Sequence, residues 1–310
     1  MGYQQVRHWL TYLMVRILVC IIQATPLRCC EHFSRLMAVL AWRLFRFRRQ
    51  LIEDNLKYAF PAMSKRDRTA IALGMWAHLT LLICEIAHTA RKVHRTNWRQ
   101  HIRLNREGDL VRLLLETRPL VLLSGHFGNF ELAGYAAGLY GFTNHTIARP
   151  LDNPYLNKFI GGFRRLNGQY ILPKQGSSAD IQRLLAADGT LAILGDQYAG
   201  RKGCWVDFLG RPASYHKSIA LFSLTTKSPL ATCYARRLGQ PLQFEIGLAD
   251  VFDPTRPQDV MTDLPGITQW YNDVLESVVL RDPEQYWWIH RRWKGSPPAP
   301  AQHSSLARSA

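Results

Sequence analysis

The segment Gly125–Glu131 has the sequence Gly-His-Phe-Gly-Asn-Phe-Glu, and it combines an imidazole with a carboxylate at a spacing that suits acid–base chemistry. The apolar run from Pro119 to Ser124 before it predicts a buried strand, and the small residues after it predict a helix packed closely on a sheet. His126 then lies in the strand-to-helix turn, where its ring can fold back towards the Glu131 carboxylate. A carboxylate behind an imidazole fixes its tautomer and makes it a better general base.

A structural interpretation of the same residues also stands. His126 can cap the predicted helix, and Glu131 can lie in its first turn because the helix dipole favours a negative charge there. The backbone N–H groups of residues 125–129 lie at the same helix N-terminus, and they include those of Gly128 and Asn129. Such groups are candidates for stabilising the oxyanion of an acyl transfer, although we expect Asn129 mainly to shape the turn.

Four more polar residues follow the predicted strands and helices of this region. Arg149 closes a strand at the sheet end where α/β sites lie, so it can meet a phosphate or form a structural ion pair. Arg164 is a candidate oxyanion stabiliser or phosphate clamp, with a plain surface arginine as the alternative. Asp196 and Gln197 end another strand and can orient Arg164 or a substrate sugar, or cap a loop. No second carboxylate or histidine stands at ligand spacing, so we expect no metal.

The chain is strongly basic, with a formal net charge of +16 over 310 residues. Basic residues cluster beside apolar, Trp-rich segments near residues 43–49, 91–95 and 291–294. We find no zinc-finger or RNP-type pattern, so nucleic acid is not the expected partner. The charge favours an anionic membrane surface, an acidic carrier protein or a phosphorylated substrate. A hydrophobic content of 47% argues against a polytopic membrane protein.

The N-terminal part contains two apolar stretches, residues 10–22 and 36–47, each with arginines in or beside it. The first is shorter than the roughly 20 residues of a typical spanning helix, and we find no convincing signal-peptide cleavage site. We therefore expect a membrane anchor that either spans marginally or lies in the interface. The six cysteines form no Cys-x-x-Cys pair, and we expect reduced core residues in a cytoplasm-facing protein.

The order of periodic segments predicts an α/β sandwich with a mostly parallel central sheet behind an N-terminal helical anchor. Expected strands cover residues 120–123, 146–149, 191–194, 229–235 and 243–246. Expected helices cover residues 49–58, 65–92, 127–140, 153–166, 179–187, 215–226 and 262–280. We divide the chain into an anchoring segment (1–48), one catalytic domain (49–295) and a Pro- and Ser-rich disordered tail (296–310).

The chain also resembles a known family. His-x4-Asp/Glu after a buried strand resembles the signature of the glycerolipid acyltransferase superfamily. Four other blocks, in order, are similar to those of the lipid A biosynthesis (lauroyl/myristoyl) acyltransferases, the late acyltransferases of lipopolysaccharide synthesis. They are Asn55-Leu-Lys-Tyr-Ala-Phe-Pro61, Arg149-Pro-Leu-Asp-Asn-Pro154 with Arg164, Gly195-Asp-Gln197 with Phe208-Leu-Gly-Arg-Pro-Ala213, and Pro283-Glu-Gln-Tyr-Trp-Trp-Ile-His-Arg-Arg-Trp-Lys294.

This resemblance implies an O-acyltransferase that works without metal or cofactor and uses His126 and Glu131 as its catalytic pair. It implies a membrane glycolipid of the lipid A precursor type as acceptor and acyl–acyl carrier protein as donor. The expected location is the bacterial inner membrane, with the catalytic domain facing the cytoplasm. Terminal-block tryptophans have two interpretations, a segment pinned to the core or a contact with membrane or substrate.

Other functions remain as alternatives. The same chemistry can serve another acceptor, such as a mannosylated phosphoinositide, an aminolipid or a lysophospholipid, with acyl-CoA as a possible donor. A non-catalytic lipid-binding protein of the membrane surface is a different class, and the intact pair of His126 and Glu131 argues against it. A hydrolase is disfavoured because the sequence has no Gly-x-Ser-x-Gly elbow.

Overall fold

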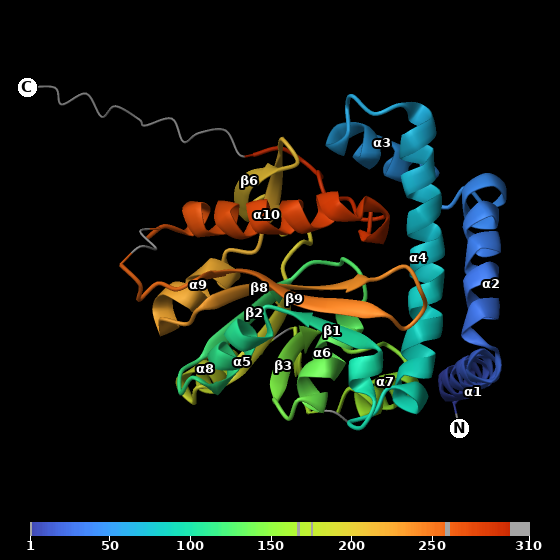
Figure 1. Ribbon diagram of the computed structural model, residues 1–310, viewed down its shortest axis with the longest axis horizontal. Helices are drawn as coiled ribbons and strands as arrows, with labels where there is room; N and C mark the ends of the chain where they lie inside the picture. The colour runs from blue at the N-terminus through green and yellow to red at the C-terminus, as the bar shows by residue number, and fades with distance from the viewer. Residues whose placement is uncertain (1, 166–167, 175, 258–260, 298–310) are drawn as a thin grey trace, which may run out of the picture.

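A seven-stranded, mostly parallel sheet forms the centre of the molecule in the computed structural model, which describes residues 2–165, 168–174, 176–257 and 261–297 (Figure 1). Its strands are β1 (Ile102–Asn105), β2 (Leu120–Ser124), β3 (Asn144–Ala148), β4 (Gln169–Pro173), β5 (Thr190–Leu194), β8 (Leu230–Arg237) and β9 (Phe244–Phe252). Their order across the sheet is β1-β9-β8-β2-β5-β3-β4. Only the β8–β9 pair is antiparallel, which confirms the expected fold class.

Helices cover both faces of this sheet (Figure 1). They are α1 (Tyr3–Ala24), α2 (Leu27–Val39), α3 (Arg49–Ala59), α4 (Lys65–Lys92), α5 (Glu107–Leu115), α6 (Phe130–Leu139), α7 (Pro154–Arg165), α8 (Ser178–Ala186), α9 (Ser218–Thr226) and α10 (Leu264–Arg281). Short turns of other helix types lie at Leu40–Leu44, Trp98–Gln100 and Pro283–Gln285. A separate hairpin of β6 (Cys204–Phe208) and β7 (Arg211–Tyr215) lies against α10.

The sequence analysis missed three strand regions, and it placed the starts of two helices three residues too early. Strands β1, β4 and the β6–β7 hairpin were not expected, because they are short and lack a long apolar run. The helix expected from residue 127 begins at Phe130, because Asn129 caps it by accepting the Leu132 N–H group at 3.0 Å. The helix expected from residue 215 begins at Ser218, because Tyr215 ends β7.

The N-terminal helices cover one side of the molecule. Helix α2 lies along α4, and α1 packs on α4 and α7 (Figure 1). By length and apolar composition alone, α1 and α4 could each cross a membrane, and α1 contributes no fully buried residue whereas α4 is a core helix. The N-terminal helix fits the expected anchor. The expected tail beyond residue 297 lies outside the described residues.

The main core lies between the sheet, α4, α10 and the β6–β7 hairpin. Its largest fully buried side chains include Phe127, Tyr215, Tyr271 and Trp288. Two of the six cysteines depart from the expected core position, since Cys20 and Cys29 are exposed, while Cys30, Cys84 and Cys204 are buried and all six are free thiols. The turn after β2 thus begins directly from the main core, to which Phe127 belongs.

Candidate active site

His126 and Asp196 meet at the carboxyl ends of two neighbouring parallel strands. Ser124 of β2 is in register with Leu194 of β5, so the residues two positions further along each chain lie side by side. The Asp196 carboxylate accepts two hydrogen bonds from His126, one from the backbone N–H at 2.8 Å and one from the ring Nδ1–H at 2.6 Å. Both residues are buried. This carboxylate therefore fixes both the backbone and the imidazole of His126.

The charge state of Asp196 follows from these contacts. Burial raises the pKa of its carboxyl, but the charge of the His126 ring and the two hydrogen bonds outweigh that effect and hold the pKa well below its usual value. An ionised Asp196 keeps the proton on Nδ1, which leaves the lone pair on His126 Nε2. The Gln197 side-chain amide lies 3.3 Å from Nε2 and can donate to it. The imidazole is thus arranged to accept a proton at Nε2.

Glu131 does not contact the imidazole as the sequence analysis expected. Its carboxylate instead binds Arg164 of α7 with two hydrogen bonds, from Nη2 to Oε1 at 2.5 Å and from Nε to Oε2 at 3.1 Å. Two physical reasons account for the difference. The parallel register places Asp196 against His126, and the guanidinium fork offers Glu131 a bidentate, charge-assisted partner. Both Glu131 and Arg164 side chains are about one-fifth exposed.

Arg164 keeps one nitrogen available at this site. Within the described part of the chain, its Nη1 makes no hydrogen bond, because Nε and Nη2 are those that bind Glu131. The interaction expected between Asp196 and Arg164 is replaced by these two separate pairs, His126 with Asp196 and Arg164 with Glu131. Arg149 is exposed and binds the equally exposed Asp152 at 3.1 Å. That contact matches the structural ion pair that was the alternative for Arg149.

The backbone N–H groups of Gly128 and Asn129 are already occupied. Gly128 donates to the Gln285 carbonyl at 3.0 Å, and Asn129 donates to the Ala235 carbonyl at 2.8 Å, so neither is free to hold an oxyanion. The N–H groups of Phe130 and Glu131, at the start of α6, make no hydrogen bond within the described ranges. These two are therefore the available helix N-terminal donors.

Gly128 occupies a position that only glycine fits. Its φ is +58°, and a Cβ there would lie 1.8 Å from the Ala235 carbonyl oxygen. This close approach lets the turn pack against β8 and fixes the direction in which α6 leaves the sheet.

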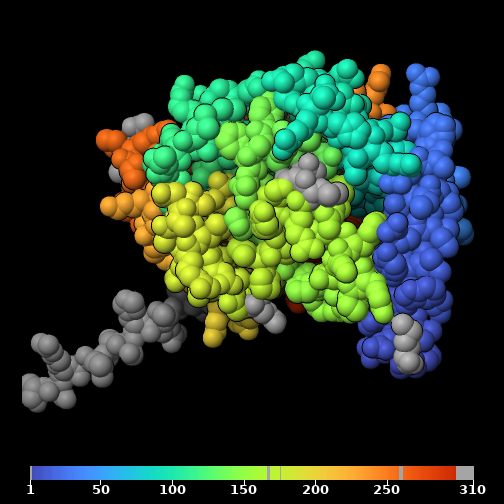
Figure 2. All heavy atoms as spheres, turned by 90° about the horizontal axis from the view of Figure 1, so that it is seen from below, coloured from blue at the N-terminus to red at the C-terminus, as the bar shows by residue number. Residues whose placement is uncertain are grey.

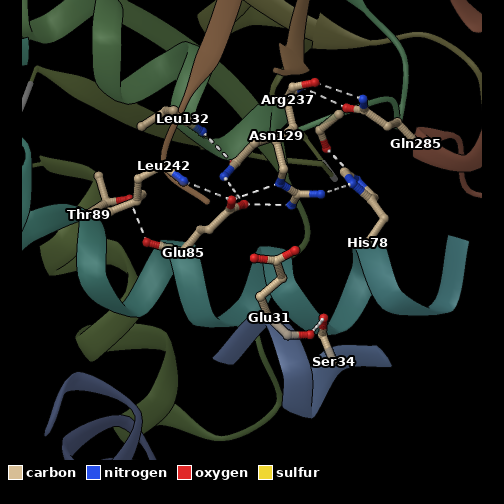
Figure 3. A network of polar contacts seen from close by, with 11 residues as sticks. Glu31, Ser34, His78, Glu85, Thr89, Asn129, Leu132, Arg237, Leu242 and Gln285 are labelled. Carbon is tan, nitrogen blue, oxygen red and sulfur yellow. Dashed lines mark hydrogen bonds and ion pairs between the residues drawn. The ribbon is translucent and has the colours of Figure 1, made fainter. Parts of the chain in front are cut away.

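A buried polar network on α4 holds the same turn (Figure 3). Arg237 Nη1 lies 2.6 Å from His78 Nδ1, and because arginine can only donate, Nδ1 must be the acceptor. His78 Nε2–H then donates to the Gly128 carbonyl at 3.2 Å. Arg237 also binds the fully buried Glu85 through Nε at 2.8 Å and Nη2 at 2.6 Å.

Burial, together with the charge of Arg237, holds the pKa of His78 well below its usual value, so His78 stays neutral and keeps this tautomer. The sequence analysis missed this network. The signal that could have indicated it is Glu85, a lone acid inside the apolar stretch of α4.

The C-terminal block surrounds the histidine from the other side. Trp287 N–H donates to the His126 carbonyl at 3.1 Å, and Tyr286 pairs with Phe127 as an isolated antiparallel bridge. The Trp287 and His290 rings lie with centroids 4.8 and 5.1 Å from that of His126. Burial, followed by the charge of His126, lowers the pKa of His290. Neutral His290 and Trp287 therefore form a wall of the site.

The block is held in place from α3. Asn55 is buried and its side-chain amide donates to the carbonyls of Trp288 and His290, both at 2.7 Å. This contact gives a structural role to Asn55, the first residue of the Asn-Leu-x-x-Ala-Phe-Pro block. It also confirms that the terminal tryptophans pin the segment to the core, since Trp288 is almost fully buried.

A largely apolar cavity of about 180 Å³ begins beside the turn that follows β2 and runs between the sheet, α5 and α6. Ser124, Asn144, Thr146 and Gln169 add uncharged polar groups to its lining, and Glu131 and Arg164 form a charged pair at one end. Phe130 lines the same end, and its ring contacts that of His126 with centroids 5.1 Å apart. The cavity has room for part of a hydrocarbon chain, and its charged end at Glu131 and Arg164 lies beside Phe130, the neighbour of His126.

Comparison with known proteins relates this site to one family. Residues 2–295 match the family described as bacterial lipid A biosynthesis acyltransferase. The chain is 22% identical over 296 residues to the lipid A biosynthesis lauroyltransferase of Escherichia coli (strain K12), covering 94% of this chain and 93% of that protein. It is 24% identical over 301 residues to the lipid A biosynthesis palmitoleoyltransferase of the same organism and to a lipid A biosynthesis acyltransferase of Shigella flexneri, with the same coverage.

Proposed function

Because the chain belongs to the bacterial lipid A biosynthesis acyltransferase family and is an acyltransferase, we propose that it moves a fatty acyl chain from acyl–acyl carrier protein to a hydroxyl of a lipid A-type glycolipid. One observation carries this proposal. The apolar cavity ends at the Glu131–Arg164 pair, beside the ring of Phe130 that contacts His126. A thioester carbonyl at that end would lie next to a base and a positive charge.

His126 is the proposed general base. Its Nε2 takes the proton from the acceptor hydroxyl as the hydroxyl oxygen attacks the thioester carbonyl carbon. Gln197 must first give up its contact with Nε2, since the hydroxyl needs the same lone pair. Asp196 stabilises the imidazolium that forms and keeps its ring oriented. When the tetrahedral intermediate collapses, the C–S bond breaks, and the leaving thiolate takes from Nε2 the proton that came from the hydroxyl.

Arg164 is the proposed oxyanion stabiliser. Its free Nη1 and the unoccupied N–H groups of Phe130 and Glu131 are the donors at the polar end of the cavity. Glu131 acts in this scheme by holding the guanidinium fork in place. It remains a residue of the catalytic site, as the His-x4-Glu motif implies, but its task is to position Arg164.

The charge and the surface of the protein support the proposed donor and location. A net charge of +16 favours an acidic carrier protein as donor, because complementary charges speed the encounter. The long apolar α1 favours a membrane-bound protein, which would give access to a lipid acceptor. We propose that the catalytic domain faces the cytoplasm at the bacterial inner membrane, the side on which acyl carrier protein is available.

Mass spectrometry of a reconstituted reaction tests this proposal. Purified full-length protein, a lipid A-type precursor and acyl–acyl carrier protein should give a glycolipid heavier by one acyl group, and the His126→Ala protein should not. Parallel reactions with matched acyl-CoA separate the two donors. Release of free fatty acid alone, with no acylated glycolipid, would instead identify a thioester hydrolase and would refute the proposal.

A further inference from the structure

Helix α1 is seated on the rest of the protein from His8 to its C-terminal end. Its partly buried residues recur every three or four positions and form one face of the helix, comprising His8, Thr11, Tyr12, Val15, Val19, Ile22 and Gln23. Seen from below, the N-terminal segment runs along one edge of the molecule and touches the segment around residues 150–165 (Figure 2). This face is therefore covered by protein from His8 to Gln23.

The N-terminal half of α1 docks on α7. The Asn153 side chain donates to the backbone carbonyl of His8 at 2.8 Å. The Tyr12 ring packs on two rings of α7, with centroids 6.0 Å from Tyr155 and 6.2 Å from Phe159. These contacts join the first half of α1 to α7 and to Asn153, the residue just before it.

The middle and the C-terminal half continue the same contact. The Arg16 guanidinium lies 4.8 Å from the centroid of the Phe159 ring. Near the end of α1, Gln23 donates to the Ala87 carbonyl of α4 at 2.7 Å and accepts from Arg91 at 3.4 Å. The two ends of α1 thus contact two different helices of the same rigid domain.

The opposite face of α1 is apolar and exposed. Six large apolar residues on it are between 38% and 64% exposed, and they are Leu10, Leu13, Met14, Ile17, Leu18 and Ile21. The neighbouring helix α2 adds two exposed apolar residues, Phe33 and Leu36, which are at least half exposed. An apolar surface of this extent on a water-soluble protein needs a partner. We call these eight residues the α1–α2 face.

We propose that α1 lies flat in the interface of an anionic phospholipid bilayer, with both of its ends on the catalytic-domain side, and does not span the membrane. The α1–α2 face meets the acyl chains in this arrangement. Exposed arginines near it, Arg7 on α1 and Arg28 on α2, meet anionic headgroups.

Length does not decide between the two arrangements, but docking does. A helix of 22 residues is about 33 Å long, which is enough to cross a bilayer. Spanning would put residues near Tyr12 at the bilayer centre, together with the α7 surface that they contact. Helix α7 also carries Lys158 and Arg165, which are exposed, and charges at bilayer depth are strongly unfavourable. A spanning α1 would therefore have to leave α7.

The flat arrangement also has a consequence for the reaction, and this part rests on the proposed function. Helix α7 holds Arg164 near its C-terminal end, at the polar end of the cavity. Docking of α1 on α7 brings that edge of the active site to the bilayer surface. A glycolipid acceptor could then reach His126 with its acyl chains still in the membrane.

Cysteine labelling measures the sidedness of α1 directly. In full-length protein with Cys20 and Cys29 changed to alanine, Gln4→Cys and Gln182→Cys place exposed thiols on α1 and on α8 of the catalytic domain. We expect a membrane-impermeant maleimide to label both in inverted vesicles and neither in intact right-side-out vesicles. Labelling of Gln4→Cys from the opposite side to Gln182→Cys would overturn the proposal.

Cross-linking and vesicle binding test the two faces of α1. A short bifunctional thiol reagent should join Tyr12→Cys to Phe159→Cys in membranes, and the control pair Met14→Cys with Phe159→Cys should remain unjoined. Leu13→Glu with Ile17→Glu should reduce flotation with anionic phospholipid vesicles at least tenfold, while Gln182→Glu should not. A missing Tyr12–Phe159 cross-link, or a soluble dimer that buries the α1–α2 face and does not float, would contradict the proposal.

These assays do not read acyl transfer, so the two proposals fail separately. An inactive protein with the expected labelling pattern would refute the proposed function and leave the flat helix intact. An active enzyme whose Gln4→Cys labels from the far side would do the reverse.

Discussion

Replacing the two carboxylates of the site one at a time separates the pairing seen in the structure from the pairing that the motif suggests. Asp196→Asn is the informative change. Asp196 accepts from the His126 backbone N–H at 2.8 Å and from Nδ1–H at 2.6 Å, and asparagine has a single side-chain oxygen. Whichever way its amide is turned, the NH₂ group must face one of these two nitrogens.

Both orientations harm catalysis. An NH₂ group facing Nδ1 donates to it and moves the ring proton to Nε2, which removes the lone pair that the acceptor hydroxyl needs. An NH₂ group facing the backbone N–H opposes two donors in a buried place, which costs about 1–3 kcal/mol, and the imidazolium loses its counter-charge. A misplaced tautomer of this kind costs about 10⁴-fold in the serine-protease triad. We expect kcat of Asp196→Asn to fall by about 10³- to 10⁴-fold.

Glu131→Gln should be milder. Glutamine keeps one acceptor for Arg164 but loses the ionic part of the contact, worth about 1.5–3 kcal/mol, or roughly ten- to a hundredfold in rate. Initial rates with saturating donor measure both variants, with circular dichroism and Tm to check the fold. Asp188→Asn, an exposed aspartate, is the matched control. The reasoning is refuted if Glu131→Gln is as inactive as His126→Ala while Asp196→Asn stays within tenfold of wild type.

Three further predictions follow from the same geometry. Arg164→Lys should lower kcat about ten- to a hundredfold with little change in acceptor KM. Lysine lacks the guanidinium fork that binds Glu131 through Nε and Nη2 and presents Nη1 to the oxyanion. A change confined to KM would instead indicate that Arg164 binds a substrate phosphate in the ground state. Ala137→Leu should shorten the preferred acyl chain, because Ala137 lines the cavity. Each methylene group excluded from the cavity loses about 0.8 kcal/mol of burial, or about fourfold in kcat/KM. An unchanged chain-length profile would show that this cavity does not bind the acyl chain. The folded state holds the pKa of His78 far below that of the unfolded chain, so stability should be full above about pH 6.5 and should fall below it by up to about 1.4 kcal/mol per pH unit from this residue. Denaturant titrations at several pH values measure the free energy of unfolding. Below about pH 6.5 this free energy should depend less on pH in His78→Gln, because glutamine keeps a donor and an acceptor but does not titrate. An equal pH dependence in the two proteins would contradict this role of His78.

Much of the sheet could be predicted from the sequence because its central strands are continuous apolar runs. The expected strands at 120–123 and 191–194 lie within β2 and β5, and the long helix at 65–92 matches α4 at both ends. A capping serine, Ser64, sets the start of that helix by accepting the Asp67 N–H group. The edge strands β1 and β4 could not be predicted, because their burial alternates over only four or five residues.

The sequence could indicate five of the residues that gather in the candidate site, but not the contacts between them. His126, Glu131, Arg164, Asp196 and Gln197 do gather at the carboxyl ends of β2 and β5 and the mouth of the cavity. Their pairing depends on strand order and register, which a single sequence does not contain. The wall formed by the terminal block depended on a contact between segments 160 positions apart, which no local pattern reports.

The pairing of His126 with Asp196, and not with Glu131, has a physical reason besides strand register. A base that becomes an imidazolium needs a counter-charge that water does not screen, and Asp196 is buried whereas the Glu131 side chain is about one-fifth exposed. A carboxylate at the cavity mouth would also repel the oxyanion that forms there, unless a cation neutralised it. Arg164 neutralises Glu131, and its Nη1 makes no hydrogen bond within the described residues. In the proposed mechanism, Glu131 therefore serves the oxyanion side of the reaction by holding Arg164, while Asp196 serves the base.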